Sequence, residues 1–121
     1  MAVSSETPQV FFPCPGCGFL VFDEGPGSFE ICPICDWEDD AAQLKFPVLR
    51  GGANSQSLAE QQQPWLRIIP PDVAEYDGYH RDPTWRPLRP EEIETGEIMP
   101  QSGTQYFEAV VSADGRYYWK R

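Results

Sequence analysis

Four cysteines near the start of the chain form two Cys-x-x-Cys pairs. Cys14 and Cys17 make the first pair, Cys32 and Cys35 make the second, and fourteen residues separate the pairs. Two residues between cysteines let one tight turn present both sulfurs to a single ion, and two such turns complete a tetrahedral set of ligands. The spacing predicts a four-cysteine metal site that holds Zn²⁺. A rubredoxin-like iron site, which uses similar turns, is the less favoured alternative.

The residues around the cysteines indicate a structural metal. Both pairs, "CPGCG" and "CPICD", carry proline after the first cysteine, and proline and glycine suit tight turns. A redox dithiol would need a basic setting that lowers a thiol pKa, whereas Asp23, Glu24, Asp36 and Glu38 are acidic. Four thiolates also leave no open position on the metal, which a catalytic zinc requires. We therefore expect the metal to hold a segment that is too small to fold alone.

Strand and turn signals surround the cysteine pairs. Residues 19–22 suit a strand, "DEGPGS" suits a turn, and the return strand begins with "FEIC", so we expect a ribbon. Each cysteine pair then lies where a strand meets a tight turn. The stretch "WEDDAAQLKF" predicts a short helical turn after the ribbon.

The second half of the chain contains helix caps and many prolines. Ser57 and Glu60 fit a capping box at the start of a helix, which Pro64 should kink or end. The segment "PPDVAEYDGYHRDPTWRPLRP" predicts irregular structure. A short helix should begin at Pro90 and end at Gly96. The runs "QYFEAVV" and "RYYWKR" around "SADG" predict a C-terminal hairpin.

Length and composition predict one small α+β domain. The chain has 121 residues, of which 40% are hydrophobic and 13% aromatic, and its thirteen prolines and ten glycines favour long irregular connections. We expect a flexible tail at 1–10 and a zinc-ribbon region at 11–62. A loop-rich extension at 63–121 should end in the hairpin and pack on the ribbon.

The net charge of −10 favours a basic partner. Residues 1–60 carry two basic and nine acidic groups, and residues 61–121 carry seven basic and ten acidic groups. Such a chain repels phosphate backbones, which argues against direct nucleic-acid binding. It would attract a basic protein, although solubility alone could also explain the charge.

The N-terminal stretch "MAVSSETPQVFFP" lacks the basic and apolar regions of a signal peptide. No run approaches the roughly 18 apolar residues of a membrane span. We therefore expect a cytoplasmic protein without membrane contact. In a reducing cytosol, paired cysteines favour metal over disulfides.

The stretches "FPCPGCGFLVF", "SFEICPICDWEDD" and "GGANSQSLAE" resemble the bacterial cysteine-rich CPCC domain over about residues 11–62. The resemblance implies a metal site and does not supply an activity. The family name reflects Cys-Pro-Cys-Cys, and this chain has Gly16 in place of the middle cysteine. The family ligands that carry over are Cys14, Cys17, Cys32 and Cys35.

An acidic run follows the second cysteine pair. Asp36, Glu38, Asp39 and Asp40 could together contact basic residues of a partner. They could instead form a solvated turn or cap the N-terminus of a helix. A cation site or a general acid–base pair is a weaker alternative.

A second candidate for partner contact is the aromatic-rich segment "EYDGYHRDPTWRP". Tyr76, Tyr79 and Trp85 belong to the residue types that are enriched in binding hot spots. The alternative is that these rings cover the core while the charged residues of the segment stay in water.

No catalytic constellation is recognisable. His80 is the only histidine and should lie on the surface, and the metal uses all the thiols. We therefore expect a protein that is not an enzyme and binds another protein, in particular an immunity protein that neutralises a basic nuclease toxin. The alternative is a zinc-ribbon accessory factor of transcription or translation machinery. Such ribbons usually carry basic residues where this one has Asp23, Glu24 and Glu30.

Overall fold

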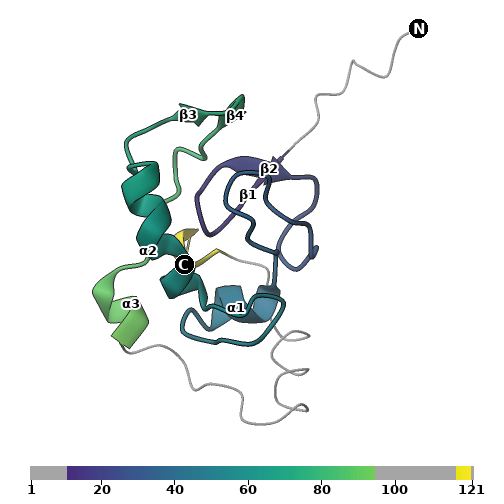
Figure 1. Ribbon diagram of the computed structural model, residues 1–121, viewed down its shortest axis with the longest axis vertical. Helices are drawn as coiled ribbons and strands as arrows, with labels where there is room; N and C mark the ends of the chain where they lie inside the picture. The colour runs from purple at the N-terminus through teal and green to yellow at the C-terminus, as the bar shows by residue number, and fades with distance from the viewer. Residues whose placement is uncertain (1–10, 95–116, 121) are drawn as a thin grey trace, which may run out of the picture.

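A computed structural model describes residues 11–94 and 117–120 (Figure 1). The structure contains both helices and small β-sheets, which confirms the α+β class. Long irregular connections join these short elements. The two small sheets each have two antiparallel strands. The elements in chain order are β1 Phe12–Pro13, β2 Leu20–Phe22, α1 Ala41–Lys45, α2 Leu58–Ile68, β3 Glu75–Tyr76, β4 Tyr79–His80, α3 Pro90–Glu94 and the 3-10 helix η2 Tyr118–Lys120.

The predicted return strand after β2 is wrong. β2 pairs with β1, which precedes it in the chain, so that Phe12 lies opposite Phe22. Residues 29–32 pair through backbone hydrogen bonds with residues 37–39 instead. In one of these bonds the Cys32 N–H donates to the Trp37 carbonyl at 2.9 Å. The ribbon is thus replaced by two small antiparallel loops. Each Cys-x-x-Cys turn closes its own loop, because the turn itself reverses the chain.

The β3–β4 hairpin lies in the segment predicted to be irregular. Asp77 and Gly78 join its strands, and both have positive φ, 52° and 85°. These angles are those of the two-residue type I′ turn, for which Asp-Gly is a favoured sequence. The signal was therefore present in the sequence, hidden among the surrounding prolines.

Both helices after the cysteines begin where local signals place them. Asp40 caps α1, and Ser57 and Glu60 form the predicted capping box of α2. We predicted that Pro64 would kink or end α2, and an end at Pro64 is wrong, since the helix continues to Ile68. Proline removes one intrahelical hydrogen bond, but burial of residues on both sides of an exposed proline can outweigh that loss.

At the C-terminal end, α3 begins at Pro90 as predicted, while Gly96, most of the predicted hairpin and the 1–10 tail lie outside the described residues. Residues 118–120 form a 3-10 helix and not a strand. Tyr118 is buried, and its hydroxyl accepts a hydrogen bond from Gln62 of α2 at 3.0 Å. This contact holds η2 beside α2, as Figure 1 shows.

The hydrophobic core is built around the cysteines. Trp37 packs in this core together with the four cysteines. No helix among the described residues combines the length and apolar character that crossing a membrane requires. The buried core residues are Cys14, Cys17, Phe19, Phe22, Cys32, Cys35, Trp37, Leu44, Leu58, Ile69, Tyr117 and Tyr118.

Candidate metal centre

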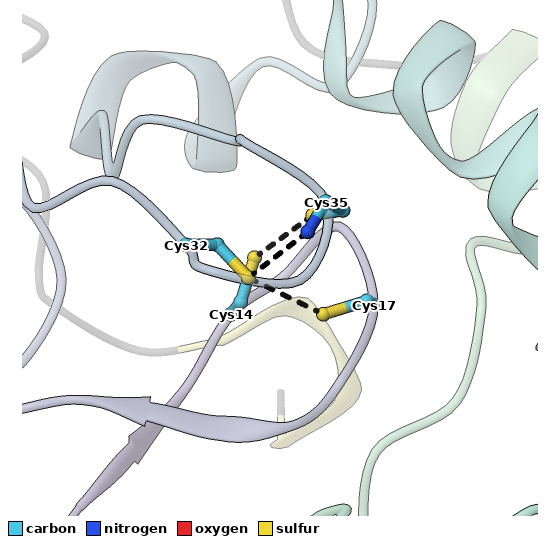
Figure 2. Close-up of side chains that lie close together, drawn as sticks. All are labelled: Cys14, Cys17, Cys32 and Cys35. Carbon is cyan, nitrogen blue, oxygen red and sulfur yellow. Dashed lines mark hydrogen bonds between the residues drawn. The ribbon is translucent and has the colours of Figure 1, made fainter. Parts of the chain in front are cut away.

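The four cysteine sulfurs converge on one point, as Figure 2 shows. All four Sγ atoms lie within 4.8 Å of one another. The Cys14–Cys35 and Cys17–Cys32 Sγ pairs are each 3.7 Å apart. A disulfide requires about 2.05 Å, so the thiols are free. The predicted ligands are thereby brought together in one buried cluster.

The geometry fits a tetrahedral metal. Zinc lies about 2.3 Å from each thiolate, which places tetrahedral sulfurs roughly 3.8 Å apart. The observed 3.7 Å matches that separation. The backbone N–H groups of Ile34 and Cys35 also point at the Cys32 Sγ, at 3.3 and 3.4 Å, where they would stabilise a thiolate. The four cysteines are therefore arranged to hold a metal ion.

The thiols influence one another's protonation. Burial raises the pKa of Cys14, while hydrogen bonds from the Cys14 and Cys17 thiols lower the pKa of Cys32. Cysteines bind a metal ion as thiolates, so metal binding and proton release are coupled.

The first knuckle, residues 14–17, lies between β1 and β2. The N–H groups of Cys17 and Gly18 donate to the Cys14 carbonyl at 3.3 and 2.6 Å and close the turn. Gly18 has φ +85°, and a Cβ there would overlap the Trp85 ring. Every residue from Pro13 to Phe19 is buried.

Side chains from distant segments cover the first knuckle. The Pro15 carbonyl accepts hydrogen bonds from Gln62 Nε2 at 2.9 Å and Trp85 Nε1 at 3.2 Å. The Cys17 carbonyl accepts one from Arg81 Nε at 2.9 Å. The first knuckle is thus part of the protein core.

The second knuckle, residues 32–35, is open to solvent on one side. Ile31 before it is 61% exposed, and Pro33 and Asp36 are also exposed. Its inner side is held by Gln61 of α2, whose Nε2 donates to the Cys35 carbonyl at 2.8 Å. Only the cysteines of this knuckle are buried, while its tip faces outward.

A polar network supports the second knuckle from the loop before α2. The side-chain amide of Asn54 accepts a hydrogen bond from the Glu38 N–H and donates one to the Glu38 carbonyl, both at 2.8 Å. It thereby bonds to this backbone as a neighbouring strand would. The Asp40 carboxylate accepts the Ala53 N–H at 2.9 Å. The buried Gln43 amide donates to the carbonyls of Leu49, Asn54 and Gln56. The motifs "WEDDAAQ" and "GGANSQS" are therefore two halves of one network.

Gly16 faces the second knuckle across the cluster. A Cβ at this position would lie 3.2 Å from the Gln61 Cγ and 3.3 Å from the Cys35 Sγ. The glycine leaves room for Gln61 to reach the Cys35 carbonyl.

For two residues of the predicted acidic patch, the prediction of an exposed contact surface is wrong. Asp39 and Asp40 are only 2% and 1% exposed, so they cannot contact a partner. Asp39 accepts hydrogen bonds from the Ser28 N–H at 3.1 Å and hydroxyl at 2.8 Å. Asp40 caps α1, which confirms the capping alternative for this residue. Asp36 is exposed and Glu38 half-buried, and both line the same surface hollow.

The predicted aromatic patch is also corrected. Trp85 is buried against the first knuckle, and Tyr79 packs partly on the core. Tyr76 alone of the three is exposed. His80 is exposed as expected, with its Nε2 3.4 Å from a Glu75 carboxylate oxygen.

The residues that the sequence analysis missed are those that support the cysteine turns. Gln61 and Gln62 are adjacent on α2, and each donates to a different knuckle. The capping box fixes their register, but nothing local shows that the knuckles lie beside this helix. Arg81 is only 8% exposed, so the alternative in which the charged residues of the aromatic-rich segment stay in water does not hold for this residue.

Two cysteine knuckles that close around one buried cluster define a small metal-binding domain. Residues 12–68, a little under half of the chain, match the family model described as Cysteine-rich CPCC. A comparison with curated proteins found no match.

Proposed function

We propose that this protein is a cytoplasmic, non-enzymatic binding domain in which a structural zinc ion holds a protein-recognition surface. The observation that carries the proposal is the solvent-exposed surface of the second knuckle. It combines apolar and acidic side chains, whereas the first knuckle is covered. We call this surface the open knuckle face and define it as Phe29, Ile31, Asp36 and Glu38.

Phe29 supports a binding role because its position costs stability. It has φ 61° and is 52% exposed. A left-handed backbone costs a non-glycine residue about 1–2 kcal/mol. Because Phe29 is half exposed, its burial stabilises the fold less than that of a phenylalanine in the core. Strained residues of this kind cluster at functional sites, which favours a contact outside the chain.

The acidic part of the face suits a basic side chain. Ile31 forms an antiparallel bridge with Glu38, so the two side chains lie on the same side. Asp36 and Glu38 line a hollow of about 310 Å³ together with polar residues. Lysine and arginine carry a cation on an apolar stem, which could lie on Ile31 while the cation meets the carboxylates.

A basic nuclease toxin is the partner that we propose. The chain has a net charge of −10, and an acidic surface speeds association with a basic protein. Four buried sulfurs also complete the coordination of zinc, so the metal would have no position for a substrate. The zinc ion would thus hold the knuckle and take no part in a reaction.

Affinity purification of the tagged chain from its host at moderate salt, with mass spectrometry, tests this proposal. The test variant is Asp36→Asn with Glu38→Gln, and the control is Asp77→Asn with Glu75→Gln, which changes the net charge equally at exposed residues elsewhere. We expect one stoichiometric basic protein with nuclease activity, retained by the wild type and the control. Its association with the test variant should be slower and less dependent on salt.

Equal weakening in both double variants would mean that net charge matters and the open knuckle face does not. Capture of polymerase or ribosomal components would replace the toxin partner by the accessory-factor alternative.

A further inference from the structure

Arg81 is a buried cation beside the cysteine cluster. Its Nε donates to the Cys17 carbonyl at 2.9 Å. Its other N–H groups donate to the carbonyls of Pro70 at 2.7 Å, Val73 at 3.0 Å and Ile69 at 3.3 Å. Every one of these partners is a neutral carbonyl group, so the hydrogen bonds of Arg81 are satisfied but none of them is to a carboxylate.

No carboxylate of the described residues forms an ion pair with Arg81, and the Asp72 carboxylate acts on its charge only from a longer distance. Among the described residues, the ion pairs of arginine are Arg50–Glu60 and Arg86–Glu92. The Arg81 guanidinium lies instead over the rings of Phe19, at 4.4 Å, and Trp85, at 5.0 Å. Burying an ion without an opposite charge costs several kcal/mol. An arginine in this position therefore calls for a source of negative charge nearby.

The metal centre would supply that charge. Four thiolates around Zn²⁺ carry a net charge of about −2, which is itself buried in the core. We infer that Arg81 is the counter-charge of the metal centre, and that it couples metal binding to the docking of residues 69–85 on the first knuckle. This inference rests on the proposed zinc centre and adds a residue that lies outside the matched 12–68 segment.

Backbone contacts hold Arg81 in place. Arg81 bridges to Phe19 in antiparallel fashion, and the Asp82 N–H donates to the Gly18 carbonyl at 2.8 Å. The Trp85 ring packs on Gly18. The segment therefore docks directly beside Cys17. If docking raises metal affinity, metal binding must strengthen docking by the same factor.

Zinc affinity of the full chain, measured by competition with a chromogenic chelator, tests the inference. The variants are Arg81→Gln, which removes the charge, and Arg81→Lys, which keeps it. Arg86→Gln is the control, because Arg86 pairs with Glu92 and does not bond to a knuckle. We expect Arg81→Gln to weaken zinc binding roughly 10–100-fold, as loss of groups that support metal ligands does. Arg81→Lys should retain most of the affinity and Arg86→Gln all of it.

A second measurement separates charge from packing. In the iron-loaded chain, a nearby cation favours the reduced centre, which is more negative by one charge. The Fe³⁺/Fe²⁺ potential should therefore fall in Arg81→Gln and stay close to that of the wild type in Arg81→Lys. If Arg81→Gln fails to fold, Arg81→Lys still decides, since retained affinity despite lost guanidinium hydrogen bonds supports the charge.

Equal losses of affinity in Arg81→Gln and Arg81→Lys would overturn the inference, as would unchanged affinity in both. A wild-type chain that binds no zinc would instead refute the proposed function, so the two failures are distinguishable.

Discussion

The two cysteine knuckles share the pattern Cys-Pro-x-Cys but have opposite surroundings. The first is buried under Arg81, Trp85 and Gln62, which reach it from residues far along the chain. The second is held from within the family segment by a polar network, and its tip faces water. The same motif therefore serves as a packing surface in one place and as a display surface in the other.

Different parts of the chain build and cover the two knuckles. The matched segment 12–68 builds both knuckles and supports the second. Residues beyond it cover the first, through Arg81 and Trp85. One knuckle is therefore buried, whereas the tip of the other is open to solvent.

The largest expected loss of stability follows from removing a metal ligand, and it should be similar for the two knuckles. Because all four cysteines hold one ion, Cys14→Ser in the first knuckle and Cys32→Ser in the second should destabilise the chain similarly. Zinc contributes on the order of 10–16 kcal/mol in small zinc domains, and losing one ligand forfeits much of it. Thermal unfolding followed by circular dichroism measures the loss. An unchanged melting temperature in Cys32→Ser would show that the metal is not structural.

A matched pair of phenylalanines should expose the contrast directly. Phe19 beside the first knuckle is fully buried, so Phe19→Ala should cost about 3–5 kcal/mol. Phe29 beside the second knuckle is half exposed, and Phe29→Ala should change stability by only about 0.5 kcal/mol. Urea denaturation of zinc-loaded protein compares them. Similar losses in both variants would mean that Phe29 packs as core.

A pair of glycines tests how tightly the first knuckle is covered. Gly18 and Gly51 both have positive φ, +85° and +78°, but only a Cβ at Gly18 would meet another side chain, that of Trp85. Gly51→Ala should cost the strain alone, about 1–2 kcal/mol. Gly18→Ala should add overpacking and cost about 2–5 kcal/mol. Equal costs in the same denaturation assay would place Trp85 away from the knuckle.

The smallest effect concerns Asp39 behind the second knuckle. Burial raises the pKa of Asp39, although Ser28 hydrogen bonds act in the other direction. A raised pKa in the folded state means that stability present at low pH is lost as Asp39 ionises. Asp39→Asn should therefore raise the melting temperature at pH 7, and the gain should vanish below the ordinary aspartate value of 3.8. A variant that is less stable at pH 7 would show that the Ser28 bonds dominate.

Local signals predicted the parts of the molecule that local physics decides. The spacing of Cys14, Cys17, Cys32 and Cys35 identified the cluster, and Ser57 identified the start of α2. These features depend on residues a few positions apart. A ligand set or a cap can therefore be read without knowledge of the fold.

Long-range contacts decided what the sequence could not show. Arg81 and Cys17 are 64 residues apart, so no pattern indicated that this arginine is buried. The acidic run contains the exposed Asp36, the half-buried Glu38 and the buried Asp39 and Asp40. Asp39 and Asp36 could be told apart only once residues 37–39 had paired with 29–32.

The most direct test of the central claim is the metal content of the chain, purified under reducing conditions and measured by inductively coupled plasma mass spectrometry. We predict one zinc ion per chain, its loss in Cys14→Ser and Cys32→Ser, and unfolding when a chelator removes it. A folded, metal-free chain with four reactive thiols would contradict it.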